Sequence, residues 1–277
     1  MTLKELYSEG TEILEDNDID SPEVDAFYLL EHVSGTDRAH YLLDKDRIVA
    51  PEIAEAYMEL INKRAEHIPY QYLTGECEFM GFRMKVSPDV LIPRLDSEVL
   101  CEEALKLIHE GGAVLDMCTG SGCLAVALKK LREDVSVWAS DISANALRIA
   151  RENASINGAD VTFAEGDLFE GIDKGCTFDV IVSNPPYVTE EEYLELSPEV
   201  AGHEPKLALT AGADGLDIYR RLIPQARGYL REGGWLIMEM GCSQGLPLTD
   251  LMEQYGYKRV SVVKDLAGLD RVICGAV

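Results

Sequence analysis

The sequence lacks any uninterrupted apolar run approaching the length of about eighteen residues that marks a membrane-spanning helix. Its first residues, Met1 to Leu6, also lack the basic segment and apolar core of a signal peptide. No tract rich in proline, glycine or serine suggests disorder. These absences predict a folded cytoplasmic protein without membrane contact, and we expect a monomer.

Basic side chains are scarce: 25 Lys and Arg face 50 Asp and Glu, which gives a net charge of −25. Duplex-binding proteins gain affinity from roughly 6 to 10 contacts between Lys or Arg and phosphate. No basic cluster in this chain could supply them, so direct binding to nucleic acid is not expected.

Paired cysteines are also missing. The seven cysteines are scattered, with no Cys-x-x-Cys spacing. The pattern indicates neither a zinc site nor a disulfide framework. We therefore expect free thiols and no metal site.

Residues 1–75 are predicted to form a small bundle of short helices. Ser21 followed by Pro22 is typical of a helix start with a side-chain cap, and Gly35 ends the same apolar run. Pro51 opens another helix. One buried face of that helix is predicted from the spacing of Ala54, Tyr57, Met58 and Ile61.

Residues 76–92 are predicted to be a β-hairpin connector, because apolar and polar residues alternate around Gly81. From residue 93 to 277, strands and helices alternate, as in a doubly wound Rossmann-like α/β domain with a seven-stranded sheet. We expect the strands at about 113–117, 135–140, 160–164, 178–183, 234–240, 258–264 and 270–276.

A glycine turn follows the first of these strands. Cys118-Thr119-Gly120-Ser121-Gly122 leads directly into an apolar helix. Such a turn lets a ligand approach the backbone closely, and the helix N-terminus favours an anionic group. The segment predicts a site for a nucleotide-like cofactor.

Two acidic residues, Asp141 and Asp167, help to identify the cofactor. Asp141, at the end of the second strand, is placed to accept hydrogen bonds from ribose hydroxyls, which suits NAD and S-adenosylmethionine equally. Asp167-Leu168, after the third strand, could contact an adenine through an acceptor and an apolar face. This pair favours S-adenosylmethionine, whose product would be S-adenosylhomocysteine.

The fourth strand ends in Asn184-Pro185-Pro186-Tyr187. Ligands of open α/β sheets bind beyond the carboxyl ends of the strands, so this tetrapeptide is expected to face the same crevice. Asn184 offers a carbonyl acceptor, and the two prolines remove competing N–H donors. Two acceptors could aim a planar NH₂ nitrogen at a methyl donor, with Tyr187 packed against the planar target.

At this point the chain resembles the HemK/PrmC protein-(glutamine-N5) methyltransferases, which modify the Gly-Gly-Gln motif of peptide chain release factors. The likeness extends over almost the whole chain. Besides Asn184 to Tyr187, it includes Pro69-Tyr70-Gln71-Tyr72-Leu73-Thr74-Gly75, Leu91-Ile92-Pro93-Arg94, Leu115-Asp116 with Thr119 to Gly122, His203-Glu204-Pro205 with Ala208-Leu209, Asp214-Gly215-Leu216-Asp217, and Asp265-Leu266-Ala267-Gly268-Leu269-Asp270-Arg271.

The resemblance implies a class I methyltransferase domain, a helical N-terminal domain that helps dock the release factor, and a glutamine bound by Asn184 to Tyr187. Asn184, Pro185 and Tyr187 are the implied catalytic residues. The implied cofactor residues are Cys118, Thr119, Gly120, Ser121, Gly122, Asp141, Asp167, Leu168 and Asn184.

The chain departs from the family pattern at Cys118, where a glycine is usual, at Leu95-Asp96-Ser97 and at His203. A Cβ at position 118 is expected either to narrow the approach to the cofactor or to demand a negative φ, which predicts altered affinity rather than lost binding.

The sequence is compatible with three alternative functions. A glutamine methyltransferase acting on a ribosomal protein would use the same chemistry. An N6-adenine methyltransferase of nucleic acid could grip a flipped base with the same tetrapeptide, although the chain is acidic. A binding module that has lost catalysis is the third.

Overall fold

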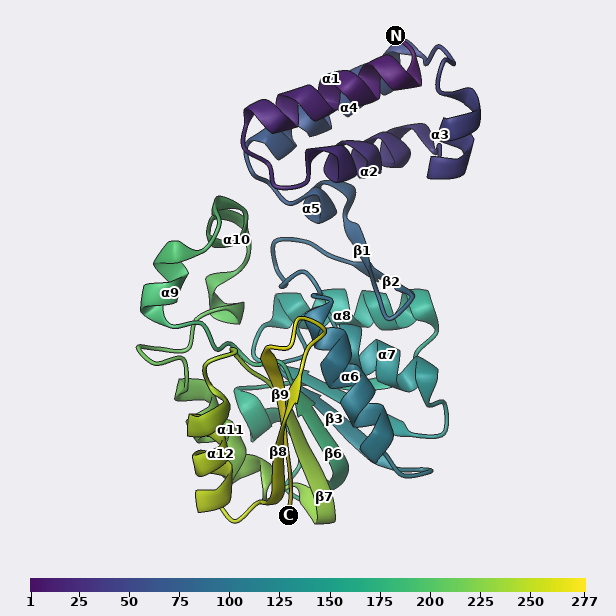
Figure 1. Cartoon of the computed structure of the whole chain (residues 1–277). Coiled ribbons are helices and arrows are strands. Elements are labelled where there is room, and N and C mark those ends of the chain that lie inside the picture. Colours follow the sequence, from purple (N-terminus) through teal and green to yellow (C-terminus); the bar gives the residue numbers. More distant parts are fainter. The chain divides into compact units, whose positions relative to one another are not determined.

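The computed structural model describes residues 1–277, and its contacts divide the chain into two units. The first consists of Met1–Gly75 together with Ser197–His203, and the second of Glu76–Leu196 and Glu204–Val277. Figure 1 follows the chain through both. No helix combines the length and apolar character that crossing a bilayer requires.

The first unit is helical, as predicted. Its helices are α1 (Leu3–Asp16), α2 (Pro22–Ser34), α3 (Arg38–Asp44), α4 (Pro51–Ala65), α5 (Tyr70–Thr74) and α10 (Pro198–His203). Their core is apolar, and it contains the fully buried Leu6, Leu29, Tyr57 and Ile61. Two of the four positions predicted for the inner face of α4 therefore lie in this core, and Ala54 and Met58 pack at its margin.

The starts of α2 and α4 and the end of α2 lie where the sequence predicts them. Pro22 and Pro51 each occupy the first helical turn, and Gly35 ends α2 in a left-handed conformation with φ of 63°. The prediction that Ser21 caps α2 with its side chain is wrong, because the Ser21 hydroxyl makes no capping bond. Its backbone φ of −135° and ψ of 61° lie outside the extended region that most capping residues adopt.

A buried arginine holds the separate segment 197–203 within the first unit. Arg64 Nε donates to Asp25 Oδ2 at 2.7 Å, and Arg64 Nη2 donates to Glu199 Oε2 at 2.5 Å. Arg64 is only 4% exposed and Asp25 only 5%. Since a buried charge is tolerated only with partners, this triad fixes α10 against α2 and α4.

The second unit begins with the predicted hairpin, β1 (Glu76–Phe79) and β2 (Phe82–Lys85). Met80 and Gly81 form its turn, both with positive φ, which is the geometry of a tight hairpin turn. Phe79 and Met84 are buried in the main core of this unit. Asn153 also holds the hairpin, since its side chain bonds both the N–H and the carbonyl oxygen of Lys85.

The seven-stranded sheet is confirmed, and its order is β5-β4-β3-β6-β7-β9-β8. The strands are β3 (Ala113–Met117), β4 (Ser136–Asp141), β5 (Val161–Glu165), β6 (Phe178–Ser183), β7 (Leu230–Glu239), β8 (Lys258–Lys264) and β9 (Asp270–Ala276). All neighbouring pairs are parallel except those that involve β9, which is antiparallel to β7 and β8. The order reverses at β3, and this switch point is where ligands of such sheets bind.

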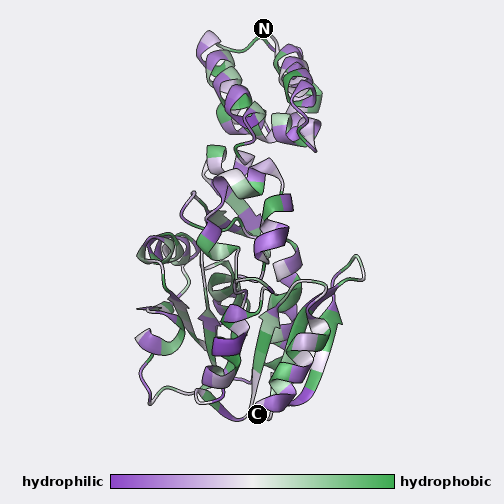
Figure 2. Ribbon diagram, turned by 90° about the vertical axis from the view of Figure 1, so that its left-hand side faces the viewer, coloured by the Kyte–Doolittle hydropathy of each residue, from purple (hydrophilic) through white to green (hydrophobic).

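Helices cover both faces of the sheet, as Figure 1 shows. One face packs against α6 (Asp96–Leu107), α7 (Cys123–Leu131) and α8 (Ala144–Asn157), and the other against α11 (Asp217–Ala226) and α12 (Gly245–Gln254). Alternate strand residues supply the two cores: Val114 and Val180 face one, while Leu115 and Ile181 face the other. The central strands are accordingly mostly green in Figure 2.

Between β6 and α11 the chain forms α9 (Glu190–Glu195), then α10, then the short η2 (Lys206–Ala208). A further short helix, η1 (Leu168–Gly171), follows β5. Both η1 and η2 contribute residues to the cavity described next.

Candidate functional site

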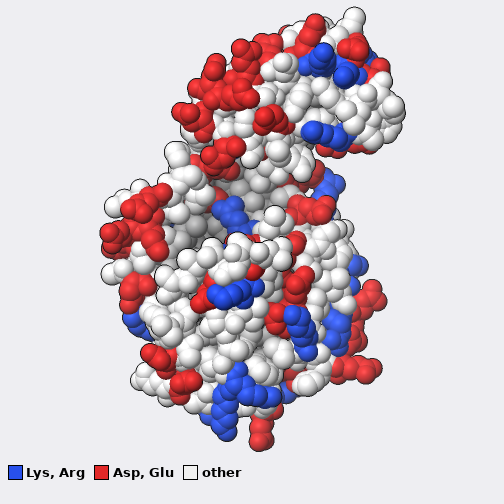
Figure 3. Space-filling model, viewed as in Figure 1, with Lys and Arg blue, Asp and Glu red and all other residues white.

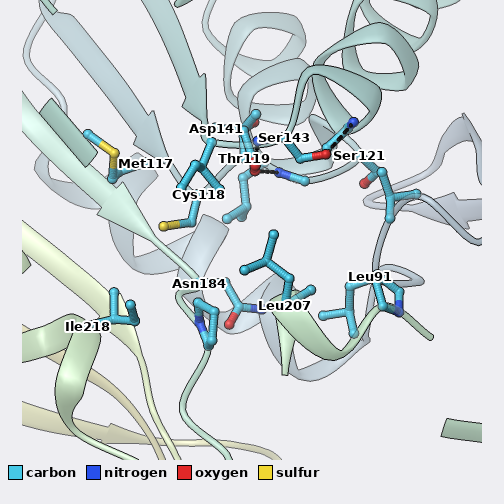
Figure 4. A pocket seen from close by; sticks show the side chains of 18 of the residues that line it. Leu91, Met117, Cys118, Thr119, Ser121, Asp141, Ser143, Asn184, Leu207 and Ile218 are labelled. Carbon is cyan, nitrogen blue, oxygen red and sulfur yellow. Dashed lines mark hydrogen bonds between the residues drawn. The ribbon is translucent and has the colours of Figure 1, made fainter. Parts of the chain in front are cut away.

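A cavity of about 280 Å³ opens at the carboxyl ends of β3, β4 and β6. Figure 4 shows its walls: Cys118, Thr119 and Asp141 lie on one side, with Asn184 and Leu207 across from them. All of the residues that line it belong to the second unit. No histidine lines it, and no group of three His, Cys, Asp or Glu side chains in the chain could hold a metal ion.

The glycine loop between β3 and α7 turns through three left-handed residues. Cys118, Gly120 and Gly122 have φ of 62°, 54° and 78°. A Cβ at Gly122 would lie 2.9 Å from Cβ of Ala150 in α8, so a side chain there would force α7 and α8 apart. Gly122 is outside the cavity lining, and its lack of a side chain serves helix packing.

Acceptors within the protein already bind three of the N–H groups of this loop. Thr119 N donates to Ser140 O at 3.0 Å, Gly120 N donates to Asp141 Oδ2 at 2.8 Å, and Gly122 N donates to Thr119 O at 2.8 Å. A dinucleotide site needs such groups free for pyrophosphate. With the Asp141 carboxylate beside the loop, a phosphate anion would also be repelled.

Asp116 fixes the loop from below. Its Oδ2 accepts from the Thr119 hydroxyl at 2.5 Å and from the Ala125 N–H at 3.1 Å, whereas its Oδ1 is buried without a partner. The residue is fully buried, and burial raises the pKa of Asp116 to about 7. Asp116 thus ties the start of α7 to the loop without reaching the cavity.

Asp141 lines the cavity at the end of β4. Its two oxygens accept from the N–H groups of Gly120, at 2.8 Å, and Ser143, at 2.9 Å. Burial raises the pKa of Asp141, and these backbone bonds oppose the rise. Each carboxylate oxygen has a second lone pair, so the oriented group can still accept hydrogen bonds from a vicinal diol.

Asp167 and Leu168 form part of the wall beyond β5. The Asp167 carboxylate pairs with Arg221 of α11 at 2.7 Å. Leu168 has φ of 53° and is 5% exposed, so a strained backbone holds its side chain in the apolar wall. The Asp167 carboxylate, an acceptor, and the apolar Leu168 side chain therefore lie next to each other in the cavity wall.

The tetrapeptide after β6 is divided between the cavity and the interior. Asn184 and Pro186 line the cavity, while Pro185 is buried. Tyr187 lies outside the lining, and its hydroxyl donates to Glu239 Oε1 at 3.1 Å. Burial raises the pKa of Tyr187 well above its usual value, so it stays protonated as a donor.

Of the residues predicted for the site, nine line this cavity and three do not. The nine are Cys118, Thr119, Gly120, Ser121, Asp141, Asp167, Leu168, Asn184 and Pro186, and the three are Gly122, Pro185 and Tyr187.

Sequence reasoning missed several further lining residues. They include Met117, Ser143, Ser97, Leu207, Ile218 and Arg221. Ser143 lies two residues beyond Asp141 and could have been found by position. Leu207 and Ile218 lie far away in sequence and carry no local signal, and Ser97 stands out only as part of a departure from the family pattern.

Cys118 takes the place expected of a glycine without changing the turn. Of the two alternatives expected for a side chain there, a negative φ is wrong, since Cys118 keeps a φ of 62°; a narrowed approach to the cofactor stays a prediction. Its Cβ projects beside the cavity (Figure 4), and burial raises the pKa of the thiol. The thiol is consequently a wall of the cavity rather than a nucleophile.

The chain matches two family models. The one described as PrmC N-terminal domain matches residues 5–75, and the one described as methyltransferase small domain matches residues 93–199.

Two proteins named release factor glutamine methyltransferase are similar over nearly their whole length. The one from Geobacter sulfurreducens is 39% identical and covers 95% of this chain and 93% of its own. The one from Koribacter versatilis is 40% identical and covers 99% of this chain and 98% of its own. Among solved structures, a methyltransferase from Pyrococcus furiosus superposes with a TM-score of 0.57 at 20% identity, over 78% of this chain and 98% of that one, and shows the same fold.

Proposed function

The chain belongs to the release factor glutamine methyltransferases, and on that premise we propose that its cavity brings S-adenosylmethionine beside the glutamine of a release factor's Gly-Gly-Gln motif. The product is a glutamine methylated on its side-chain amide nitrogen. The observation that carries the proposal is the position of Asn184, which faces the glycine loop and Asp141 across one cavity (Figure 4).

The donor set supports S-adenosylmethionine over a dinucleotide. Three of the loop's N–H groups are engaged and the Asp141 carboxylate lies beside the loop, which disfavours pyrophosphate but suits a ligand with a cationic sulfonium and ammonium. Asp141 would accept from the ribose hydroxyls, and Asp167 with Leu168 would face the adenine. When bound, this molecule supplies an electrophilic methyl group and leaves as the neutral thioether S-adenosylhomocysteine.

Asn184 would act on the glutamine by orientation. An amide nitrogen is a poor nucleophile because its lone pair is delocalised, so it must be held with that lone pair aimed at the methyl carbon. Orientation can contribute about 7–11 kcal/mol, against roughly 3–5 kcal/mol from acid–base catalysis. The first effect suffices, which fits a cavity that no histidine lines.

The proton balance needs no strong base. As the C–N bond forms and the C–S bond breaks, positive charge moves from sulfur to nitrogen, and an N-alkylated protonated amide is very acidic. Its proton can pass to water or to the acceptor that held it. Asn184 Oδ1 and the carbonyl groups beside the prolines would hold the two N–H bonds before that step.

A protein partner fits the charge of the surface. Acidic side chains gather over the N-terminal helices in Figure 3, and the basic ones lie in small separate groups. Such a surface gives no support to the nucleic-acid alternative, and no relative described above is named for a ribosomal protein. We propose that the helical unit docks the release factor and that the reaction takes place in the cytoplasm.

Mass spectrometry of release factor incubated with enzyme and donor tests this function. The expected result is one added methyl group on the glutamine of Gly-Gly-Gln, absent when that glutamine is replaced by glutamate. Methyl incorporated into a ribosomal protein or nucleic acid, with none in the release factor, would overturn the proposal. Donor binding without transfer to any of them would indicate a binding module.

A further inference from the structure

A chain of three hydrogen bonds joins both ends of the tetrapeptide to one buried carboxylate. Asn184 Nδ2 donates to Ser97 Oγ at 3.1 Å, and Ser97 Oγ donates to Glu239 Oε2 at 2.5 Å. Tyr187 donates its hydroxyl to the other oxygen, Glu239 Oε1, at 3.1 Å. Ser97 belongs to α6 and Glu239 ends β7, so two elements remote in sequence meet behind the motif.

This network has only one consistent direction. A carboxylate can only accept, so the single proton of the Ser97 hydroxyl is committed to Glu239. Ser97 can therefore offer Asn184 nothing but a lone pair, and Asn184 must turn its NH₂ group toward it. The carbonyl oxygen Oδ1 is then directed to the cavity that Asn184 lines (Figure 4).

Glu239 accepts from Ser97 and Tyr187 in the interior of the fold. Glu239 is 1% exposed and Ser97 3% exposed, so water cannot substitute for either partner. Burial raises the pKa of Glu239, whereas the bonds from Ser97 and Tyr187 and the charge of Arg271 lower it. Arg271 is itself paired with Asp265 at 3.0 Å and Asp96 at 3.2 Å, which keeps a cation near the carboxylate.

We propose that Ser97 and Glu239 are positioning residues that set the polarity of the Asn184 amide, so that an oxygen and not an NH₂ group meets the substrate nitrogen. The inference rests on the proposed function, because the polarity matters only if the substrate group is a donor. An inverted Asn184 would bring two NH₂ groups together. Ser97 lines the cavity but bonds Asn184, Glu239 lies buried behind it, and both act through Asn184.

Glu239→Gln is the sharpest variant, because it keeps the shape of the side chain but replaces an acceptor oxygen with an NH₂ donor. The Ser97 hydroxyl can then accept from the introduced amide and donate to Asn184 Oδ1, which turns the NH₂ group of Asn184 into the cavity. We expect kcat to fall at least 100-fold, with the donor Kd unchanged within twofold. Glu253→Gln, on the exposed side of α12, is the matched control and should keep normal kcat.

Ser97 variants test the middle of the hydrogen-bond chain that runs from Glu239 through Ser97 to Asn184, called the relay below. Ser97→Ala should lower kcat 10- to 100-fold, whereas Ser97→Thr, which keeps the hydroxyl, should restore most of it. Ser155→Ala on the exposed face of α8 controls for loss of a serine hydroxyl. Adding Glu239→Gln to Ser97→Ala should lower kcat little further, because Ser97→Ala already breaks the hydrogen-bond chain between Glu239 and Asn184.

A readout without substrate separates this proposal from the proposed function. In protein labelled with ¹⁵N-asparagine, the Asn184 NH₂ signals, assigned by their loss in Asn184→Ala, should shift in Ser97→Ala and Glu239→Gln but not in Glu253→Gln. If the wild type methylates release factor while Glu239→Gln and Ser97→Ala remain folded with normal kcat, the relay is refuted. If the wild type does not methylate release factor, the proposed function is wrong, and the NMR shifts still show whether Ser97 and Glu239 orient the Asn184 amide.

Discussion

The carboxylate of Asp141 accepts a hydrogen bond from the N–H of Gly120 at 2.8 Å. The acid that ends β4 therefore also closes the glycine loop that follows β3. The Asp141 side chain both fixes the shape of the loop and presents acceptors to the cavity. Its removal should therefore weaken ligand binding in two ways.

Asp141→Ala is expected to weaken S-adenosylmethionine binding by about 10- to 100-fold, because hydrogen bonds to a charged group are worth roughly 1.5–3 kcal/mol. Isothermal titration calorimetry measures the change. Asp160→Ala, an exposed acid outside the cavity lining, is the control. Unaltered donor affinity in Asp141→Ala would remove Asp141 from the site.

Asn184→Ala is expected to abolish methyl transfer while leaving donor binding largely intact, because the side chain positions the acceptor amide. A single-turnover assay with release factor, compared with calorimetry of the donor, separates the two effects. Near-normal turnover in this variant would contradict the mechanism. Loss of donor binding equal to that in Asp141→Ala would instead assign Asn184 to the cofactor alone.

Cys118→Gly is expected to leave the free energy of unfolding unchanged or higher by up to about 1.5 kcal/mol. A left-handed residue with a Cβ costs about 1–2 kcal/mol, of which the extra chain entropy of glycine cancels roughly 0.5–1 kcal/mol. Urea denaturation gives the value, and destabilisation beyond 1 kcal/mol would show that the thiol packs favourably. Iodoacetamide should modify the exposed Cys242 well before Cys118, as peptide mapping would reveal.

Asp116→Asn is expected to reduce the dependence of stability on pH. The folded pKa of Asp116, about 7, lies above its ordinary value of 3.8. The folded state thus binds the proton more tightly, so the wild type loses stability as pH rises from about 4 to about 7, by up to about 4 kcal/mol. Denaturation at pH 4.5 and 8 gives the free energy of unfolding of each protein. Relative to the wild type, the variant should be more stable at pH 8 than at pH 4.5, and an equal difference at both pH values would contradict the prediction.

Arg64→Ala is expected to destabilise the first unit by about 3–5 kcal/mol, because it leaves Asp25 buried without a cation. Hydrogen exchange in α2 and α4 reports the loss locally. Lys63→Ala, which removes an exposed pair on the same helix, should change little. The double variant Asp25→Leu with Arg64→Met should recover most of the loss, and its failure to do so would point to a role for Arg64 beyond charge pairing.

Local signals explain what the sequence could predict of the fold. Pro22, Gly35 and Pro51 act through their own backbone geometry, so the helix ends they mark are where they were expected. All seven strands of the sheet were predicted at positions that overlap those observed. β7 nevertheless begins at Leu230, earlier than expected, because Gly233 and Gly234 interrupt the apolar pattern without ending the strand.

The site could be predicted only where it follows strand ends. Asp141, Leu168 and Asn184 each come at or just after the end of a strand, and the cavity contains all three. Ser97 and Glu239 are separated by 142 positions, and only the packing of α6 across β7 brings them together. The Tyr187 side chain bonds the same Glu239 carboxylate, and this contact between remote residues could not be predicted from the sequence.

The first unit is discontinuous in the chain, and this limits how such a protein can be divided or recombined. Residues 197–203 stay with Met1–Gly75 through the bond from Arg64 to Glu199, so no single cut separates the two units. A chimera that exchanges residues 1–75 alone would set Glu199 against a foreign side chain. Positions 64 and 199 are therefore expected to be inherited together, and a change of charge at one should be matched at the other among homologues.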